Sequence, residues 1–177
     1  MLGDGAVVVY LGLGSNQGDR LEHLRAALGD LRQEHVQSVR ASRVYAGPYL
    51  GPGPPQPEYL NAVVEARTAL GPLALLAAAA AVEARHGRRA GTHGRPRPLD
   101  VDLLLYGGWR IRHPRLVVPH PRLAARRFVL EPLCELGVDS APLVPELPAR
   151  LAALRRLQKL DVHAEPLATG ATHDARA

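Results

Sequence analysis

Two aspartates are the residues most suited to chemistry. Asp100 and Asp102 stand two apart in the run RPLDVDLLLY. Side chains of a strand alternate between its faces, so both carboxylates point one way, while Val101, Leu103 and Leu105 point the other way into a core. Same-facing carboxylates repel each other unless a cation or an arginine lies between them. Because magnesium prefers carboxylates, phosphate oxygens and water, the pair predicts a magnesium–phosphate site. The alternative is an exposed strand face with solvated acids.

A loop rich in arginine precedes this strand. Arg88, Arg89, Arg95 and Arg97 lie within ten residues of one another. Guanidinium groups match phosphate oxygens bidentately, so an arginine three residues before Asp100 could reach phosphates that a metal anchors there. The alternatives are a solubilising loop and a patch for nucleic acid.

Further polar and aromatic residues are weaker candidates when each is taken alone. Asn61 presents donors and an acceptor that suit the edge of a flat heterocycle, but its amide could equally satisfy a neighbouring backbone. Tyr59 precedes it, beyond a loop at residues 47–57 that is rich in proline and glycine. Histidine at position 120 is more often structural than functional, and Phe128 belongs by default to a core.

The elements that must position these residues follow a simple order. Apolar and β-branched runs predict strands at 6–11, 36–45, 59–68 and 99–106. Helical spacing predicts helices at 19–34 and 72–85, the second opened by a proline. The order β-α-β-β-α-β predicts an α+β, ferredoxin-like sandwich, with a mostly antiparallel sheet and helices on one face.

Later segments are less regular. We expect a short edge strand at 109–111, a partial helix at 122–136 and a terminal helix at 148–156. Residues 1–160 are predicted to form a single domain, and 161–177 a disordered tail that lacks periodicity.

Composition narrows the class of protein. The chain has 177 residues, a formal charge of +5 and a pI of about 10, so it attracts anions. Aromatic residues are 4% of the chain, which is few for a module that stacks bases, and we expect no nucleic-acid partner. A single cysteine fits a reducing cytoplasm. The early apolar run is too short for a membrane span, so no membrane association is expected.

One glycine pattern points elsewhere. Gly12, Gly14 and Gly18 after a strand hint at dinucleotide binding. That fingerprint requires a parallel β-α-β continuation, whereas the two strands between residues 36 and 68 have no helix between them. We therefore expect these glycines to shape a tight turn near the site.

Four segments in order carry a resemblance to a known family. They are YLGLGSN at 10–16, LGP with QPEYLN within 50–61, PRPLDVDLL at 96–104, and VPHP with RRFVLEPL within 118–133. Together they resemble the 6-hydroxymethyl-7,8-dihydropterin pyrophosphokinases of folate synthesis, over about residues 7–136. The resemblance implies the ferredoxin-like fold and the transfer of pyrophosphate from ATP to the hydroxymethyl group of the pterin, with release of AMP.

The resemblance also implies roles for individual residues. Asp100 and Asp102 look like ligands of two Mg²⁺ ions, and with Arg88 and Arg97 they form the implied catalytic set. The implied ATP contacts are Glu83, Arg88, Arg97, Leu103, His120 and Arg126. The implied pterin contacts are Gly47, Pro48, Leu50, Tyr59, Asn61 and Phe128. The expected partners are ATP and the dihydropterin, and the expected state is a cytoplasmic monomer.

The chain departs from the family pattern in the loops that border the predicted site. Gly94 stands where an aromatic residue often covers the pterin, and Arg95 stands where a small residue is usual. A second arginine after Arg88 is displaced to Arg89 or lost. Pro121 replaces a common tyrosine, and a threonine of the pterin loop is Gly47. These changes concern lid contacts and affinity, not the predicted metal site.

Two rival functions fit parts of the pattern. A ferredoxin-like RNA-binding module would share the fold and the basic charge, but paired acids repel a phosphate backbone unless metal intervenes. Another metal-dependent nucleotidyl- or phosphotransferase could use the same pair of acids. Formation of AMP rather than ADP with the pterin separates the second rival from the predicted enzyme.

Overall fold

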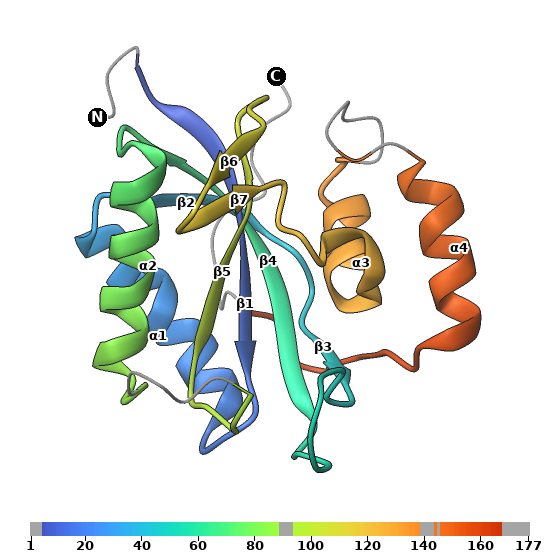
Figure 1. Ribbon diagram of the computed structural model, residues 1–177. Helices are drawn as coiled ribbons and strands as arrows, with labels where there is room; N and C mark the ends of the chain where they lie inside the picture. Colours follow the sequence, from blue (N-terminus) through green and yellow to red (C-terminus); the bar gives the residue numbers. More distant parts are fainter. Residues whose placement is uncertain (1–4, 89–93, 139–143, 145, 168–177) are drawn as a thin grey trace, which may run out of the picture.

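The computed structural model describes residues 5–88, 94–138, 144 and 146–167. Its middle layer is a six-stranded antiparallel sheet in the order β5-β1-β4-β3-β8, with β2 also paired to β4 (Figure 1). The strands of this sheet are β1 (Val7–Ser15), β2 (Gln37–Ala41), β3 (Tyr45–Gly47), β4 (Tyr59–Thr68), β5 (Asp100–Tyr106) and β8 (Asp161–Val162). The order confirms the predicted α+β, ferredoxin-like arrangement.

Helices cover both faces of the sheet. They are α1 (Arg20–Gln33), α2 (Pro72–Arg85), α3 (Arg127–Glu135) and α4 (Leu147–Leu157), with a short 3₁₀ turn at Leu123–Ala125. In Figure 1, α1 and α2 lie on one side of the sheet and α3 and α4 on the other. The prediction of helices on one face was therefore wrong, because the apolar side of α3 needs the second face for its burial.

Local sequence explains where the first two helices begin. Asp19 caps α1, because its side-chain Oδ1 accepts a hydrogen bond from the Glu22 amide at 3.1 Å. Pro72 opens α2 at a position where a missing N–H costs nothing. Leu24 and Ala27 of α1 and Leu75 of α2 are fully buried in the core beneath the sheet.

β1 runs further than predicted. Its last four residues, 12–15, were expected in a turn, but they pair with β4 as far as the register Ser15 to Leu60. The Leu104 side chain packs over the bare backbone of Gly12, and a Cβ built on Gly12 would contact it at 3.5 Å. The predicted strand at 36–45 is instead two strands, β2 and β3, which pair with different parts of β4.

An irregularity in β5 corrects one predicted orientation. The pairing of β1 with β5 shifts between Tyr10 and Leu11, so that Leu104 is an extra residue in β5. Leu103 points into a core, as predicted, and shares it with residues of α1 and α2. Leu105 was predicted on the same face, but it packs on the opposite face with residues of α3. The strict alternation assumed from sequence therefore holds for residues 100–103 and fails after them.

The remaining segments close the molecule. A separate hairpin, β6 (Ile111–His113) and β7 (Leu116–Val118), lies near the predicted edge strand at 109–111. Part of the predicted tail is ordered: β8 pairs with β3, and Leu167 is 2% exposed in the core. Residues 168–177 lie outside the described part of the chain. The domain boundary at residue 160 therefore stays a prediction, although residues 161–167 contact the predicted domain. Within the described residues, no helix combines the length and apolarity that a membrane span needs.

Candidate active site

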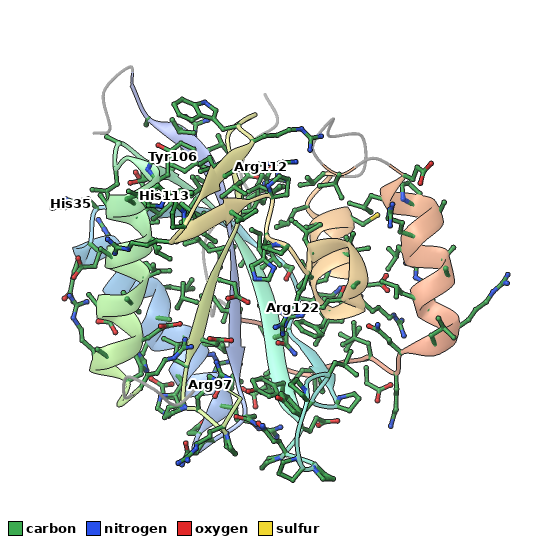
Figure 2. The ribbon with its side chains drawn as sticks, in the orientation of Figure 1. His35, Arg97, Tyr106, Arg112, His113 and Arg122 are labelled. Atoms are coloured by element: carbon green, nitrogen blue, oxygen red, sulfur yellow. The ribbon has the colours of Figure 1, made fainter. Side chains whose placement is uncertain are left out.

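A cleft of about 450 Å³ opens on the α3 side of the sheet. Its floor comes from β1, β4 and β5, and its walls come from the loops that flank these strands. In Figure 2, Arg97 lies where β5 begins and Arg122 lies beside α3, and both line the cleft. Eleven of the sequence-predicted residues also line it: Pro48, Leu50, Tyr59, Asn61, Arg88, Arg97, Asp100, Asp102, His120, Arg126 and Phe128.

The two aspartates share a face of β5, as predicted, and both carboxylates reach the cleft. Oδ1 of Asp100 accepts hydrogen bonds from Arg88 Nη1 at 2.6 Å and from Arg97 Nη1 at 3.1 Å. Oδ2 of Asp102 lies 3.6 Å from Arg126 Nη1. Burial and the neighbouring charge of Asp100 raise the pKa of the Asp102 carboxyl. The guanidinium groups of Arg126, Arg88 and Arg97 act in the opposite direction and offset part of this repulsion. Carboxylate oxygens such as these are the ligands that a hard divalent ion prefers.

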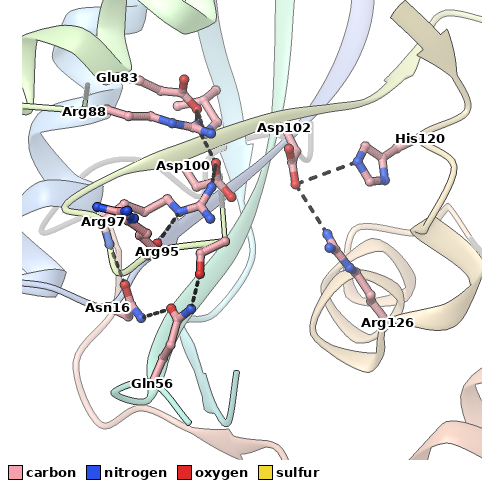
Figure 3. A network of polar contacts seen from close by, with 12 residues as sticks. Asn16, Gln56, Glu83, Arg88, Arg95, Arg97, Asp100, Asp102, His120 and Arg126 are labelled. Atoms are coloured by element: carbon pink, nitrogen blue, oxygen red, sulfur yellow. Dashed lines mark hydrogen bonds and ion pairs between the residues drawn. The ribbon is translucent and has the colours of Figure 1, made fainter. Parts of the chain in front are cut away.

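Glu83 supports this arrangement from behind. Its Oε1 accepts a hydrogen bond from the Val101 amide at 2.7 Å and another from Arg88. Burial raises the pKa of Glu83 to about 7, although the hydrogen bond from the Val101 amide and the positive charge of Arg88 oppose the rise. The residue fixes the end of α2 to β5 and holds Arg88 against Asp100 (Figure 3). It does not line the cleft.

His120 and Arg126 form the opposite wall, across from the loop arginines (Figure 3). The backbone amide of His120 donates to the carbonyl of Leu104 at 3.0 Å, which ties this wall to the irregular part of β5. Nε2 of His120 lies 4.0 Å from Asp102 Oδ2. Burial, followed by Arg126 and Arg122, lowers the pKa of His120 to about 4. The imidazole is therefore neutral at pH 7, and its approach to Asp102 is not an ion pair.

A polar network joins three loops below the arginines. Asn16 Oδ1 accepts from the Arg97 amide at 2.8 Å, and Asn16 Nδ2 donates to Gln56 Oε1 at 3.1 Å. Gln56 in turn donates to the carbonyl of Gly94 (Figure 3). Asn16 is 2% exposed, so these bonds are shielded from water. They hold the end of β1, the proline-rich loop and the start of β5 together.

Aromatic residues line the cleft beside these polar groups. Tyr59 on β4 and Tyr49 in the preceding loop stack with ring centroids 6.2 Å apart. Asn61 lies two residues further along β4 and is 6% exposed. Phe128, at the start of α3, lies under the guanidinium of Arg126 at 5.4 Å. The cleft thus places a flat apolar surface beside a cationic, carboxylate-bearing one.

Some predicted residues do not line the cleft. Leu103 is 4% exposed in the α1–α2 core, and Gly47 packs against Leu160, so their predicted ligand contacts stay predictions. Arg89 lies outside the described residues. No ligand contact was predicted for Tyr49 and Arg122, which the structure brings into the cleft. Their only sequence signal is position, since each lies beside a predicted site residue.

Known proteins share both the sequence pattern and the fold of this chain. Residues 10–138 match the family model described as 7,8-dihydro-6-hydroxymethylpterin-pyrophosphokinase. Two relatives named 2-amino-4-hydroxy-6-hydroxymethyldihydropteridine pyrophosphokinase are similar: one from Pseudomonas aeruginosa, 42% identical over 82% of this chain and 90% of its own length, and one from Synechocystis, 40% identical over 76% of this chain and 67% of its own length.

Longer proteins match as well. A mitochondrial folate synthesis bifunctional protein of Pisum sativum is 42% identical over 75% of this chain, which spans only 26% of that relative. A solved structure described as HPPK-DHPS in complex with substrates superposes with a TM-score of 0.65 at 10% identity, over 86% of this chain and 44% of that one. The structural match supports the fold, and the sequence matches decide the family: the chain belongs to the 7,8-dihydro-6-hydroxymethylpterin-pyrophosphokinases.

Proposed function

We infer that the chain transfers pyrophosphate from ATP to the hydroxymethyl group of 6-hydroxymethyl-7,8-dihydropterin, releasing AMP, in tetrahydrofolate biosynthesis. One observation carries the assignment of this reaction to the cleft. Asp100 and Asp102 with three arginines line the same cleft as Tyr59 and Asn61, and Asp100 and Asn61 lie on the two sides of Gly14. A polyanion and a flat heterocycle can therefore bind side by side.

The arginine side chains of the cleft are proposed to bind the triphosphate of ATP. Arg88 and Arg97 now share one oxygen of Asp100, at 2.6 and 3.1 Å. Phosphate oxygens offer guanidinium groups bidentate partners, so both arginines can turn from the carboxylate to the nucleotide. Arg126 and the neutral His120 provide a second charge and a hydrogen-bond donor from the opposite wall.

Asp100 and Asp102 would hold magnesium, and two ions are proposed. The side chains are 25% and 34% exposed toward the cleft, so their oxygens remain accessible. Described acidic and histidine residues do not form a group of three suited to a metal, so the remaining ligands would come from phosphate and water. Bound there, the ions would neutralise charge on the triphosphate and polarise it for attack.

Tyr59, Asn61 and Phe128 are proposed to hold the pterin. Tyr59, 8% exposed on β4, offers a rigid ring face, and Phe128 offers a second apolar surface. The Asn61 amide can donate and accept at the edge of the heterocycle. Pro48 and Leu50 line the same cleft from the loop after β3.

The reaction then needs positioning more than covalent help from the protein. The pterin hydroxyl oxygen forms a bond to the β-phosphorus, the bond from that phosphorus to the oxygen bridging to the α-phosphate breaks, and the hydroxyl proton leaves to solvent. AMP departs with the bridging oxygen. The cleft holds attacking and leaving oxygens in line, and the arginines stabilise charge that develops between them.

Replacing an aspartate tests both the reaction and the metal assignment. We expect Asp100→Asn and Asp102→Asn each to reduce AMP formation at least about a thousandfold, because several kcal/mol of charge stabilisation are lost. Circular dichroism should show the fold intact. AMP, ADP and the pterin product are separated by chromatography, with magnesium or with a chelator.

Asp161→Asn, on the exposed strand β8, is the matched control and should keep full activity. ADP as the product would refute the pyrophosphokinase assignment. Near-normal turnover of Asp100→Asn would refute the metal site alone. The monomeric state, the cytoplasmic location and the lack of nucleic-acid or membrane partners remain predictions from sequence.

A further inference from the structure

Two histidines meet between α1 and α2, on the side of the sheet away from α3 (Figure 1). Nδ1 of His23 lies 2.9 Å from Nδ1 of His86, and the two rings pack edge to face with centroids 5.2 Å apart. The other ring nitrogen of His86, Nε2, lies 2.9 Å from Asp30 Oδ2. Neither histidine lines the cleft, and no role was predicted for either. These three residues form the histidine network.

The network joins the end of one helix to the flank of another. His23 and Asp30 lie seven residues apart on α1, about two helical turns, so both can face α2. His86 is the residue at which α2 ends, and its side chain is only 8% exposed. Arg85 also reaches Asp30, at 3.8 Å, but it is 39% exposed, and an exposed ion pair contributes little. The His86 contacts are therefore the better shielded link between the two helices.

The network holds only certain numbers of protons. The Asp30 carboxylate accepts, so Nε2 of His86 donates to it. The contact between the two Nδ1 atoms needs a proton on one of them, and either ring can supply it. With a proton on both, two donors would face each other and the contact would break. The histidine pair therefore tolerates one positive charge and not two.

Neighbouring groups act on the same protons. Burial of His23 and its contact with His86 lower the pKa of the His23 ring, although two acids at the start of α1 oppose this. Nε2 of His23 lies beside the backbone of Gly18, since a Cβ built there would meet it at 3.2 Å. The charged residues described around the pair are Asp19, Glu22, Asp30, Glu34 and Arg85.

The anchored end of α2 leads directly to a site residue. Gly87 follows His86 with a φ of +84°, and the amide of Arg88 then donates to the Glu83 carbonyl at 3.1 Å. Nη1 of Arg88 donates to Asp100 Oδ1 at 2.6 Å in the cleft. Only one residue separates the buried imidazole of His86 from Arg88. A shift of the helix end would therefore displace this guanidinium.

We propose that the histidine network is a positioning unit that fixes the end of α2 to α1 and so holds Arg88 at the place where phosphate binds. The inference rests on the proposed function. The unit works while one of the two Nδ1 atoms carries a proton, and it releases the helix end when both do. Use of the nucleotide is thereby made sensitive to mild acid.

The first test removes the link at neutral pH and follows AMP formation. His86→Ala should lower kcat/KM for ATP about tenfold at pH 7.5, because a misplaced arginine stabilises less of the developing charge. The KM for the pterin should stay within about twofold of the wild type. His86→Gln keeps a donor that can reach Asp30 and should recover kcat/KM to within about threefold. Circular dichroism checks the fold of each variant.

A double-mutant cycle tests whether His86 acts through Arg88. In an Arg88→Ala background, the His86→Ala change should lower kcat/KM for ATP by less than about twofold, since the group that it positions is already gone. A further tenfold loss in that background would overturn the inference, because it would show that His86 acts by another route.

A pH series tests the proton rule. His23→Asn places an amide donor near the position of ring Nδ1 and cannot become charged. Relative to the wild type, this variant should have kcat/KM for ATP within about twofold at pH 7.5 and about three- to tenfold higher at pH 5. Titration within the cleft is common to both proteins, so their ratio isolates the histidine pair. The variant stays folded without His86→Ala being needed, which keeps the rule open to refutation.

His35→Asn is the matched control for this series. His35 is an exposed histidine just beyond the end of α1, and its φ of 62° is one that asparagine adopts readily. The control should follow the wild type at both pH values. Equal pH profiles of the wild type and His23→Asn would overturn the proton rule.

The outcomes separate this inference from the proposed function. If the wild type forms AMP and His86→Ala retains its kcat/KM for ATP, only the positioning role is refuted. Equal changes in kcat/KM for ATP and for the pterin also refute it, because they indicate a general structural role. If the wild type does not form AMP, the proposed function fails, and the positioning role fails with it.

Discussion

The protonation state of His120 follows from its immediate neighbours. Nδ1 accepts a hydrogen bond from the Arg122 amide at 3.2 Å, so the proton of the neutral ring is assigned to Nε2, which faces Asp102. Burial and two arginines, Arg126 and Arg122, lower the pKa from 6.5 to about 4. The residue can therefore offer an uncharged hydrogen-bond donor to a phosphate throughout the neutral pH range.

This shift predicts a pH-dependent contribution to stability. The folded pKa lies below the unfolded value, so the unfolded chain binds more protons between pH 4 and 6.5, and stability rises with pH across that window. Relative to His120→Gln, the wild type should gain at most about 3 kcal/mol of unfolding free energy as pH rises from 4 to 6.5. Urea unfolding in chelator-containing buffer measures the difference.

His163→Gln, outside the cleft, serves as the control for this series. A difference between wild type and His120→Gln that stays constant from pH 4 to 7 would contradict the assignment of a neutral, buried ring. The folded states of both variants need checking by circular dichroism at each pH.

At the scale of elements, β1 positions the site through its glycines. Gly14 lies between β4 and β5, and a Cβ there would meet Asn61 Oδ1 at 3.1 Å and Tyr59 Cδ1 at 3.6 Å. The absence of a side chain on Gly14 therefore leaves room for Asn61 and Tyr59 to pack against β1. A run that looks like a turn in the sequence is in fact the floor of the cleft.

Gly14→Ala should push the Asn61 amide out of place without unfolding the sheet, since the contact is tight but not prohibitive. We expect the pterin Kd to rise about three- to tenfold, the loss of roughly one hydrogen bond. The Kd of the ATP analogue should not change. Gly29→Ala, on α1 with no atom within 4 Å of the added methyl group, is the matched control. Unaltered pterin binding by Gly14→Ala would refute the role given to this glycine.

Elements with strong local signals were predicted well. β4 and α2 have the predicted bounds, because a β-branched run and an N-terminal proline mark them within their own residues. The shift in β5 was not predictable in this way. It depends on the pairing with Tyr10 and Leu11 of β1, ninety-odd residues away in the chain, and it moves Leu105 to the other face.

At the scale of the whole molecule, residues 161–167 hold the edge of the sheet at β3, the strand that precedes the proline-rich loop. The His163 amide donates to the Val44 carbonyl at 2.8 Å, and Arg25 of α1 donates to the Pro166 carbonyl at 3.0 Å. Leu167 then enters the core beside α1 and α2. These contacts order residues that lack any periodic pattern of their own.

Removing this anchor should destabilise the fold. We expect Leu167→Ala to lower the free energy of unfolding by about 2–4 kcal/mol, because a fully buried leucine leaves a cavity. Leu157→Ala, which truncates a side chain that is 80% exposed, should change it by less than about 0.5 kcal/mol. Thermal and urea denaturation of the two variants test the comparison, and equal stability would mean that the segment does not contribute to the core.

The sequence alone determined the chemistry of the candidate site and the order of its main elements. Paired acids and an apolar period of two or 3.6 residues are visible within a few positions of the chain, so residue type and spacing single out Asp100 and Asp102. The role of Arg97 was implied by the resemblance to the family. The tertiary structure decided what depends on contacts distant in sequence. These are the second helical layer, the shift in β5 that turns Leu105, the stacking of Tyr49 on Tyr59, and the burial of Leu167, each fixed by packing against partners that no local pattern specifies.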